Sequence, residues 1–128
     1  MTIPQKAAIA AGAILVFLMT FQLLLAGGLP LGRAAWGGKH RVLPKKLRWA
    51  SLATVGVLGL ACWVVLSRAG LLSPGPEPVW VRVSTWFFAG FMSLNTIGNI
   101  VSKSNLERIV MTPVAALLVL CFTVVALS

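Results

Sequence analysis

Amide and hydroxyl side chains between residues 84 and 102 are the groups whose spacing could support ligand chemistry in this sequence. At 100° per residue, Ser84, Asn95, Asn99 and Ser102 fall within about 60° of one another on a helix. An amide in an apolar environment is costly unless it is hydrogen-bonded. We therefore expect this polar stripe to bridge neighbouring helices, or to line a wet cavity and bind a solute or an ion.

The segment after the stripe predicts an irregular start to the next helix. Residues 104–107 (SNLE) match a capping box, with Ser104 as the cap and Glu107 reaching back. Pro113 lies about two turns inside the helix, where it removes a backbone hydrogen bond and causes a kink. A break at membrane depth is tolerated when it is buried in protein or lines a cavity. We expect the kink and the stripe to form one polar spot. Its candidate solute- or ligand-binding residues are Asn95, Asn99, Ser102 and Thr112.

A basic segment, RAAWGGKHRVLPKKLRW, covers residues 33–49 and carries six cations and one histidine. Clusters of Lys and Arg beside a membrane span attract anionic lipid at about 1 kcal/mol per residue. The segment could also serve only to orient the chain in the membrane, or it could dock a protein partner. His40 could donate to a phosphate oxygen or remain a solvated loop side chain. The candidate anionic-lipid or phosphate residues are Arg33, Lys39, His40, Arg41, Lys45, Lys46 and Arg48.

Groups for acid–base or metal chemistry are scarce. The chain has one histidine and two acids, and it contains no HExxH, P-loop or dinucleotide-binding motif. Cys62 and Cys121 lie in apolar runs without nearby ligand types, so we interpret them as packing residues. We expect no metal, no cofactor and no enzymatic activity, and an enzyme acting on lipid is the weakest of the alternatives.

The elements that must position these groups are apolar helices. The chain is 59% apolar and 10% charged, a composition that excludes a disordered basic tail and argues against an ordinary soluble domain. Four runs are near the 20 residues that cross a bilayer, and the first contains one strongly polar side chain, Gln22. Runs such as AILVFLM do not alternate as barrel strands do. We predict an all-α bundle of four transmembrane helices, forming a single domain over 1–128. The expected helices are about 7–29, 49–66, 79–101 and 109–127, with a basic cytoplasmic loop at 30–48.

Orientation follows from the distribution of the cations. The connections between helices 1 and 2 and between helices 3 and 4 carry eight of the eleven Lys and Arg residues. Because Lys and Arg favour the cytoplasmic side, we expect a multi-pass plasma-membrane protein with both connections in the cytoplasm and both termini outside. Subunits of a homo-oligomer would then be parallel. We expect no nucleic-acid partner, because the positive charge is confined to a short loop at the membrane.

Two segments, AAWGGKHRVLP at 34–44 and LNTIGNIVSKSNLERIVMTP at 94–113, resemble parts of short, uncharacterised four-span bacterial membrane proteins. The resemblance implies the four-span fold and no particular activity.

The function that we favour from the sequence is a non-enzymatic binding or accessory protein. Its cytoplasmic face would engage anionic membrane lipid or a protein partner. The alternative is an oligomeric small channel or transporter that uses Asn95 and Asn99 as pore or solute ligands.

Overall fold

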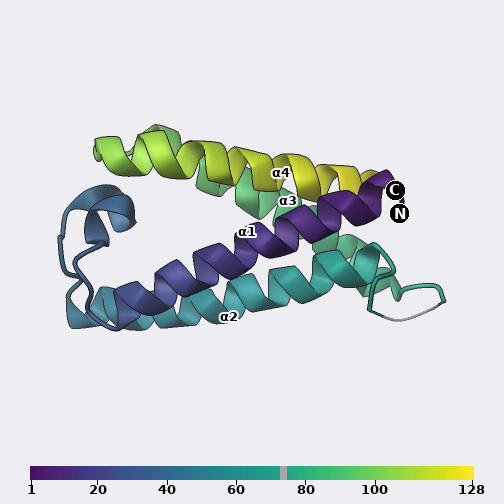
Figure 1. The fold of residues 1–128 in the computed structure, drawn as a ribbon, viewed down its shortest axis with the longest axis horizontal. Helices are drawn as coiled ribbons and strands as arrows, with labels where there is room; N and C mark the ends of the chain where they lie inside the picture. The colour runs from purple at the N-terminus through teal and green to yellow at the C-terminus, as the bar shows by residue number, and fades with distance from the viewer. Residues whose placement is uncertain (73–74) are drawn as a thin grey trace.

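The computed structural model describes residues 1–72 and 75–128, which form helices and loops only. The predicted all-α class is confirmed, and four long helices account for most of the chain (Figure 1). The elements are α1 (Ile3–Ala26), the short helices η1 (Gly32–Ala34) and η2 (Trp36–Gly38), α2 (Lys45–Arg68), α3 (Val79–Ile100), the π-helical segment η3 (Glu107–Met111) and α4 (Thr112–Leu127).

The four long helices lie side by side, and both termini are at the same end of the bundle (Figure 1). Helix α1 packs against α2 and α4, and α3 packs against α4 and α2. Successive helices therefore run in opposite directions. This arrangement gathers the α1–α2 and α3–α4 connections at the end opposite the termini.

Three helices are long and apolar enough to cross a membrane by length and composition: Ile3–Ala26, Lys45–Arg68 and Glu107–Leu127. Helix α3 has 22 residues, but Arg82 and the polar stripe make it less apolar. Its outer face is nevertheless apolar, with Leu94 70% exposed. Length and composition thus identify three candidate spans. Helix α3 is not among them, but its exposed face is apolar.

The hydrophobic core occupies the half of the bundle nearest the termini. Leu15, Val65, Met92 and Phe122 are fully buried there. Small residues such as Ala8 on the same faces let the helices approach closely. Toward the opposite end α1 and α4 diverge (Figure 1), and a smaller buried cluster of Leu25, Ala35 and Leu43 lies there.

Helices α1 and α2 begin before the expected bounds, because the residues that set their starts lie outside the apolar runs. Helix α1 begins at Ile3 instead of near 7, since Thr2 caps the backbone N–H of Gln5 and the Gln5 side chain caps Thr2 in return. Helix α2 begins at Lys45 instead of near 49, directly after Pro44, which is the cap residue.

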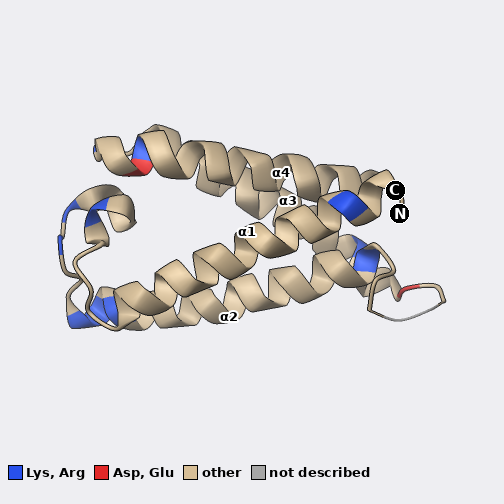
Figure 2. Ribbon diagram, in the orientation of Figure 1, with Lys and Arg blue, Asp and Glu red and all other residues tan. Residues whose placement is uncertain are grey.

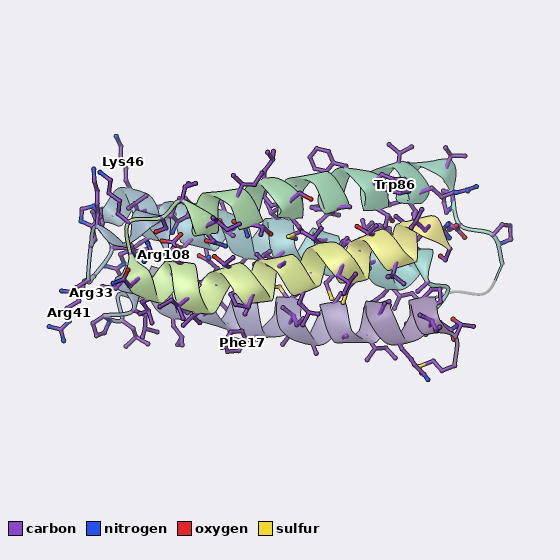
Figure 3. All side chains as sticks on the ribbon, turned by 90° about the horizontal axis from the view of Figure 1, so that it is seen from above. Phe17, Arg33, Arg41, Lys46, Trp86 and Arg108 are labelled. Carbon is purple, nitrogen blue, oxygen red and sulfur yellow. The ribbon has the colours of Figure 1, made fainter. Side chains whose placement is uncertain are left out.

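Charge separates the two ends of the molecule. Eight of the eleven Lys and Arg residues lie where α1 and α3 end and α2 and η3 begin, an end that we call the basic end (Figure 2). Arg33, Arg41, Lys46 and Arg108 gather there (Figure 3). The remaining three cations lie near the termini, where the guanidinium of Arg68 forms a 2.8 Å ion pair with a Glu77 oxygen.

Candidate functional site

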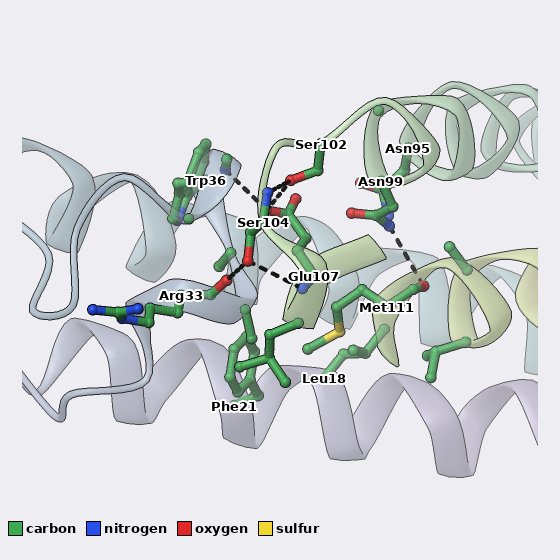
Figure 4. A pocket seen from close by; sticks show the side chains of 18 of the residues that line it. Leu18, Phe21, Arg33, Trp36, Asn95, Asn99, Ser102, Ser104, Glu107 and Met111 are labelled. Carbon is green, nitrogen blue, oxygen red and sulfur yellow. Dashed lines mark hydrogen bonds between the residues drawn. The ribbon is translucent and has the colours of Figure 1, made fainter. Parts of the chain in front are cut away.

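A cavity of about 1170 Å³ occupies the basic end of the bundle (Figure 4). All four long helices contribute to its walls, together with the loop segments 33–39 and 101–107. The side of the cavity nearest the termini is apolar and forms its floor, with Leu18, Leu58, Met92 and Ala115. Leu58 and Met92 belong to the hydrophobic core, and Leu18 packs against it. The cavity is therefore closed toward the termini, and the segments 33–39 and 101–107 line it at the basic end.

Uncharged polar side chains line the cavity above this floor. Gln22 of α1, Thr54 of α2, and Asn95 and Asn99 of α3 all contribute. The Gln22 Oε1 atom is buried and finds no hydrogen-bond partner in the described part of the chain. The Asn99 amide makes a long 3.5 Å bond to the carbonyl of Met111 (Figure 4). We call these four residues the polar layer. It offers acceptors and donors that the protein does not fully use.

Three cations, Arg33, Lys39 and Lys103, lie at the mouth of the cavity. All three are exposed. The acid on the same wall, Glu107, is only 8% exposed and already accepts hydrogen bonds. Charge at the mouth is thus predominantly positive, which favours an anion there.

The connection between α1 and α2 is not a free loop, because hydrogen bonds attach it to the rest of the basic end. We call residues 30–44 the docked loop. The Gly37 N–H donates to Glu107 Oε2 at 3.0 Å, and the Ser104 hydroxyl donates to the carbonyl of Arg33. The Trp36 indole N–H donates to the buried Ser51 hydroxyl at 3.0 Å. The α1–α2 connection is therefore joined to the α3–α4 connection across the cavity mouth.

Positive φ angles give the docked loop its shape. Trp36, Gly37 and Gly38 have φ of 52°, 78° and 73°. Gly38 also lies against the α3–α4 connection, since a Cβ built on it would be 2.8 Å from Ser104 Oγ and 3.0 Å from the Arg33 carbonyl oxygen. A Cβ on Gly37 would meet no atom within 4 Å. Glycine at 38 is thus required by conformation and by space, whereas glycine at 37 is required by conformation alone.

The expected capping box at 104–107 is formed only in part. The Ser104 hydroxyl accepts from the Glu107 N–H at 3.3 Å, as predicted. The Glu107 carboxylate does not return to the Ser104 N–H, which donates to Ser102 Oγ at 3.2 Å instead. The Glu107 carboxylate instead accepts from Ser102 Oγ and from the Gly37 N–H, because these two donors lie within its reach on the cavity side. The residue that we interpreted as a local cap therefore connects two distant segments.

The predicted solute site is brought together except for one member. Asn95, Asn99 and Ser102 all line the cavity. Thr112 is half-buried outside the cavity lining, and its hydroxyl has no hydrogen-bond partner among the described residues. Pro113 follows η3, whose π-helical turns are the irregular backbone that the proline predicted.

The seven predicted anion-binding residues do not form a single cluster. Arg33 and Lys39 are among the residues that line the cavity, although the Arg33 guanidinium points away from it (Figure 4). Arg48 has a structural role, since its Nε–H donates to the carbonyl of Ala26 at 2.9 Å and holds the end of α1. The other four are exposed on the outside of the basic end. These outward-facing residues are His40, Arg41, Lys45 and Lys46.

Sequence reasoning missed several residues of the cavity. Gln22 had a visible signal, as the one strongly polar side chain in the first apolar run. Trp36 and Thr54 had none, because their places in the cavity wall depend on tertiary packing. Comparisons of the chain with protein-family models, curated proteins and solved structures found no match. Function must therefore be argued from the geometry of the basic end.

Proposed function

We propose that this chain is a multi-pass plasma-membrane protein with four spans and no enzymatic activity, whose basic end engages anionic lipid at the cytoplasmic face. The single observation that carries the proposal is the gathering of exposed cations at one end of an otherwise apolar bundle. A protein partner docking on the same cations would be an alternative occupant of that face.

Large apolar side chains on the outside of all four helices support the membrane location. Phe17 of α1, Leu60 of α2, Phe87 of α3 and Leu120 of α4 are all more than half exposed. Such a surface is costly in water and is stable against lipid tails. The exposure of Phe87 supports α3 as the fourth span, despite its lower hydropathy.

Aromatic residues support the placement of the spans. Trp63 and Trp80 stack with ring centroids 5.1 Å apart near the end that holds the termini, and both are exposed. Trp49 is exposed near the basic end. Tryptophan is enriched at both membrane–water interfaces. These positions support a slab of lipid around the middle of the bundle.

The excess of cations sets the expected sense of insertion. With eight cations at the basic end and three at the other, the basic end lies in the cytoplasm and both termini lie outside. The outward-facing Arg41, Lys45 and Lys46 would then meet the headgroups of the inner leaflet, with about 1 kcal/mol of attraction each.

Native mass spectrometry from mild detergent tests this proposal. We expect the protein to retain anionic lipid, and the double variant Lys45→Glu, Lys46→Glu to lose most of it. The matched control is Lys6→Glu, Arg82→Glu, which makes the same charge change on exposed residues at the other end. Equal retention by the two double variants would contradict the proposal.

A small channel or transporter, with parallel subunits if oligomeric, is the second candidate. The presence of Gln22, Asn95 and Asn99 on the cavity wall favours it, because amides can replace the hydration of a solute. Flux in liposomes that disappears in Asn95→Ala and Asn99→Ala, with the fold retained, would establish this candidate over the binding protein.

A further inference from the structure

We infer that the cavity is a binding site for one anionic amphiphile, with its phosphate or carboxylate head at the mouth and its alkyl chain leaving the bundle between α1 and α4. This inference rests on the proposed membrane location. It differs from the proposed lipid contact in place and in number, since it concerns one molecule inside the bundle and not headgroups around its outside.

The mouth of the cavity is suited to the head of such a ligand. Arg33, Lys39 and Lys103 are exposed lining residues and provide positive charge near the opening. The Arg33 guanidinium points away from the cavity (Figure 4), so a change of its rotamer would bring it to a ligand head, where Arg can bind phosphate or carboxylate with two parallel hydrogen bonds. Glu107 does not cancel this attraction completely, since the lining holds one carboxylate and three cations, and that carboxylate accepts from Ser102 and from the docked loop.

The polar layer is suited to an uncharged, hydrogen-bonding neck. Gln22 Oε1 is a buried acceptor without a donor in the described residues, and a buried acceptor left unpaired is unfavourable. Gln22 lines the cavity, so a rotation of its amide group would present this acceptor to a ligand hydroxyl or amide N–H at the same depth. Asn95 of α3 lies exposed in the same cavity lining and adds a donor and an acceptor.

An apolar groove gives the chain of the ligand a route to the lipid. The groove has a volume of about 270 Å³ and is lined by Ala13, Ile14, Phe17, Val114 and Leu117 of α1 and α4. Val114 also lines the main cavity, so the two spaces share a wall. Helices α1 and α4, which line the groove, diverge toward the basic end (Figure 1). An alkyl chain that passes Val114 would leave the cavity by this apolar groove.

The size of the cavity favours an amphiphile over a free anion. Small-molecule sites have volumes of roughly 300–1,000 Å³. A cavity of about 1170 Å³ is larger than this range. An inorganic phosphate at the mouth would leave the apolar floor and the polar layer without a partner.

The test uses the full chain in mild detergent, stripped of lipid and titrated by native mass spectrometry. The probe is lysophosphatidylglycerol, which has one chain, a phosphate head and glycerol hydroxyls. Lysophosphatidylcholine removes the net charge, and inorganic phosphate removes the chain. We expect one lysophosphatidylglycerol per protein chain, with weaker binding of both comparison probes. Phosphate binding as tightly as lysophosphatidylglycerol would overturn the amphiphile as the ligand.

Two glycines on α3 provide a matched pair of variants. Gly98 lines the cavity and Gly90 does not, and a Cβ built on either meets no atom within 4 Å. Leucine is a good helix former, so both Gly98→Leu and Gly90→Leu should fold. We expect Gly98→Leu to weaken lysophosphatidylglycerol binding at least about tenfold by filling the cavity, and Gly90→Leu to leave it unchanged. Equal binding by the two variants would overturn the inference.

Variants on the outside of the basic end and variants in the cavity distinguish the failure of this inference from the failure of the proposed function. If Lys45→Glu, Lys46→Glu abolishes lipid binding and Gly98→Leu has no effect, lipid binds at the surface and the cavity inference fails. If Gly98→Leu abolishes binding and the lysine variant has no effect, the cavity inference is supported and the surface contact fails.

Discussion

Substitution of Gly38 by alanine should detach the docked loop, whereas the same substitution at Gly37 should not. Both residues have positive φ, 73° and 78°, so alanine costs each about 1–2 kcal/mol in backbone strain. At Gly38 the added Cβ would also lie 2.8 Å from Ser104 Oγ and in contact with Ser104 Cβ. At Gly37 it would meet no atom within 4 Å. The difference between the variants isolates the contact from the strain.

The magnitude follows from the bonds that the collision breaks. Moving the loop away from Ser104 removes the bond from its hydroxyl to the Arg33 carbonyl, worth about 1 kcal/mol. It also removes the bond from the Gly37 N–H to the Glu107 carboxylate, worth about 1.5–3 kcal/mol because the acceptor is charged. We expect Gly38→Ala to lower the free energy of loop opening by about 2.5–4 kcal/mol relative to Gly37→Ala.

Amide hydrogen exchange in detergent, followed by mass spectrometry of the peptide that contains residues 33–40, measures this opening. The Gly37 amide donates to Glu107, so its protection from hydrogen exchange reports the state in which the docked loop is attached. Each 1.4 kcal/mol is a factor of ten, so exchange should be faster in Gly38→Ala by well over tenfold. If the two alanine variants exchange at the same rate, the docked loop is not held by the contact with Ser104, and the reasoning is wrong.

Three further predictions concern other parts of the fold. Glu107→Gln should also speed exchange in the docked loop, by about tenfold from the weaker bonds of a neutral acceptor, whereas Glu77→Gln at the other end should leave it unchanged. Arg48→Met should lower the stability measured by denaturation in detergent by about 1.5–3 kcal/mol, because Ala26 loses a charged donor, and the exposed neighbour Lys46→Met should have little effect. Phe122→Ala should lower the same stability by about 3–5 kcal/mol, since the side chain is fully buried, and a loss below 1 kcal/mol would contradict the core described above.

Helices and charge segregation could be predicted because they depend on local sequence. Apolar runs of about twenty residues gave the long helices, and the cations between them gave the basic end. Periodicity also placed Asn95, Asn99 and Ser102 on one face, and that face lines the cavity. Helix ends were less accurate, because the Thr2 capping box and Pro44, after which α2 begins without a side-chain cap, lie outside the apolar runs.

The docked loop could not be predicted, because no local pattern encodes its contacts. The Gly37–Glu107 bond joins residues 70 positions apart, and its acceptor fits a capping box equally well in the sequence. The same limit applies to Arg48, which looked like one more cation and in fact holds the end of α1. Thr112 was assigned to the site from its position beside Pro113, but the turn of η3 places it away from the cavity lining.

The α1–α2 and α3–α4 hairpins pack tightly against each other near the termini, and hydrogen bonds join their connections at the basic end. Helix α1 has 24 residues and is therefore about 36 Å long, so its arm is many times longer than a hydrogen bond. The two hairpins would rotate about the alanine-lined contact near the termini, and the hydrogen bonds from Gly37 and Ser104 oppose that rotation at the basic end. A small rotation at this contact would produce a large change in the distance between the α1–α2 and α3–α4 connections. The hydrogen bonds of Gly37 and Ser104 therefore limit the separation of the two hairpins at the basic end.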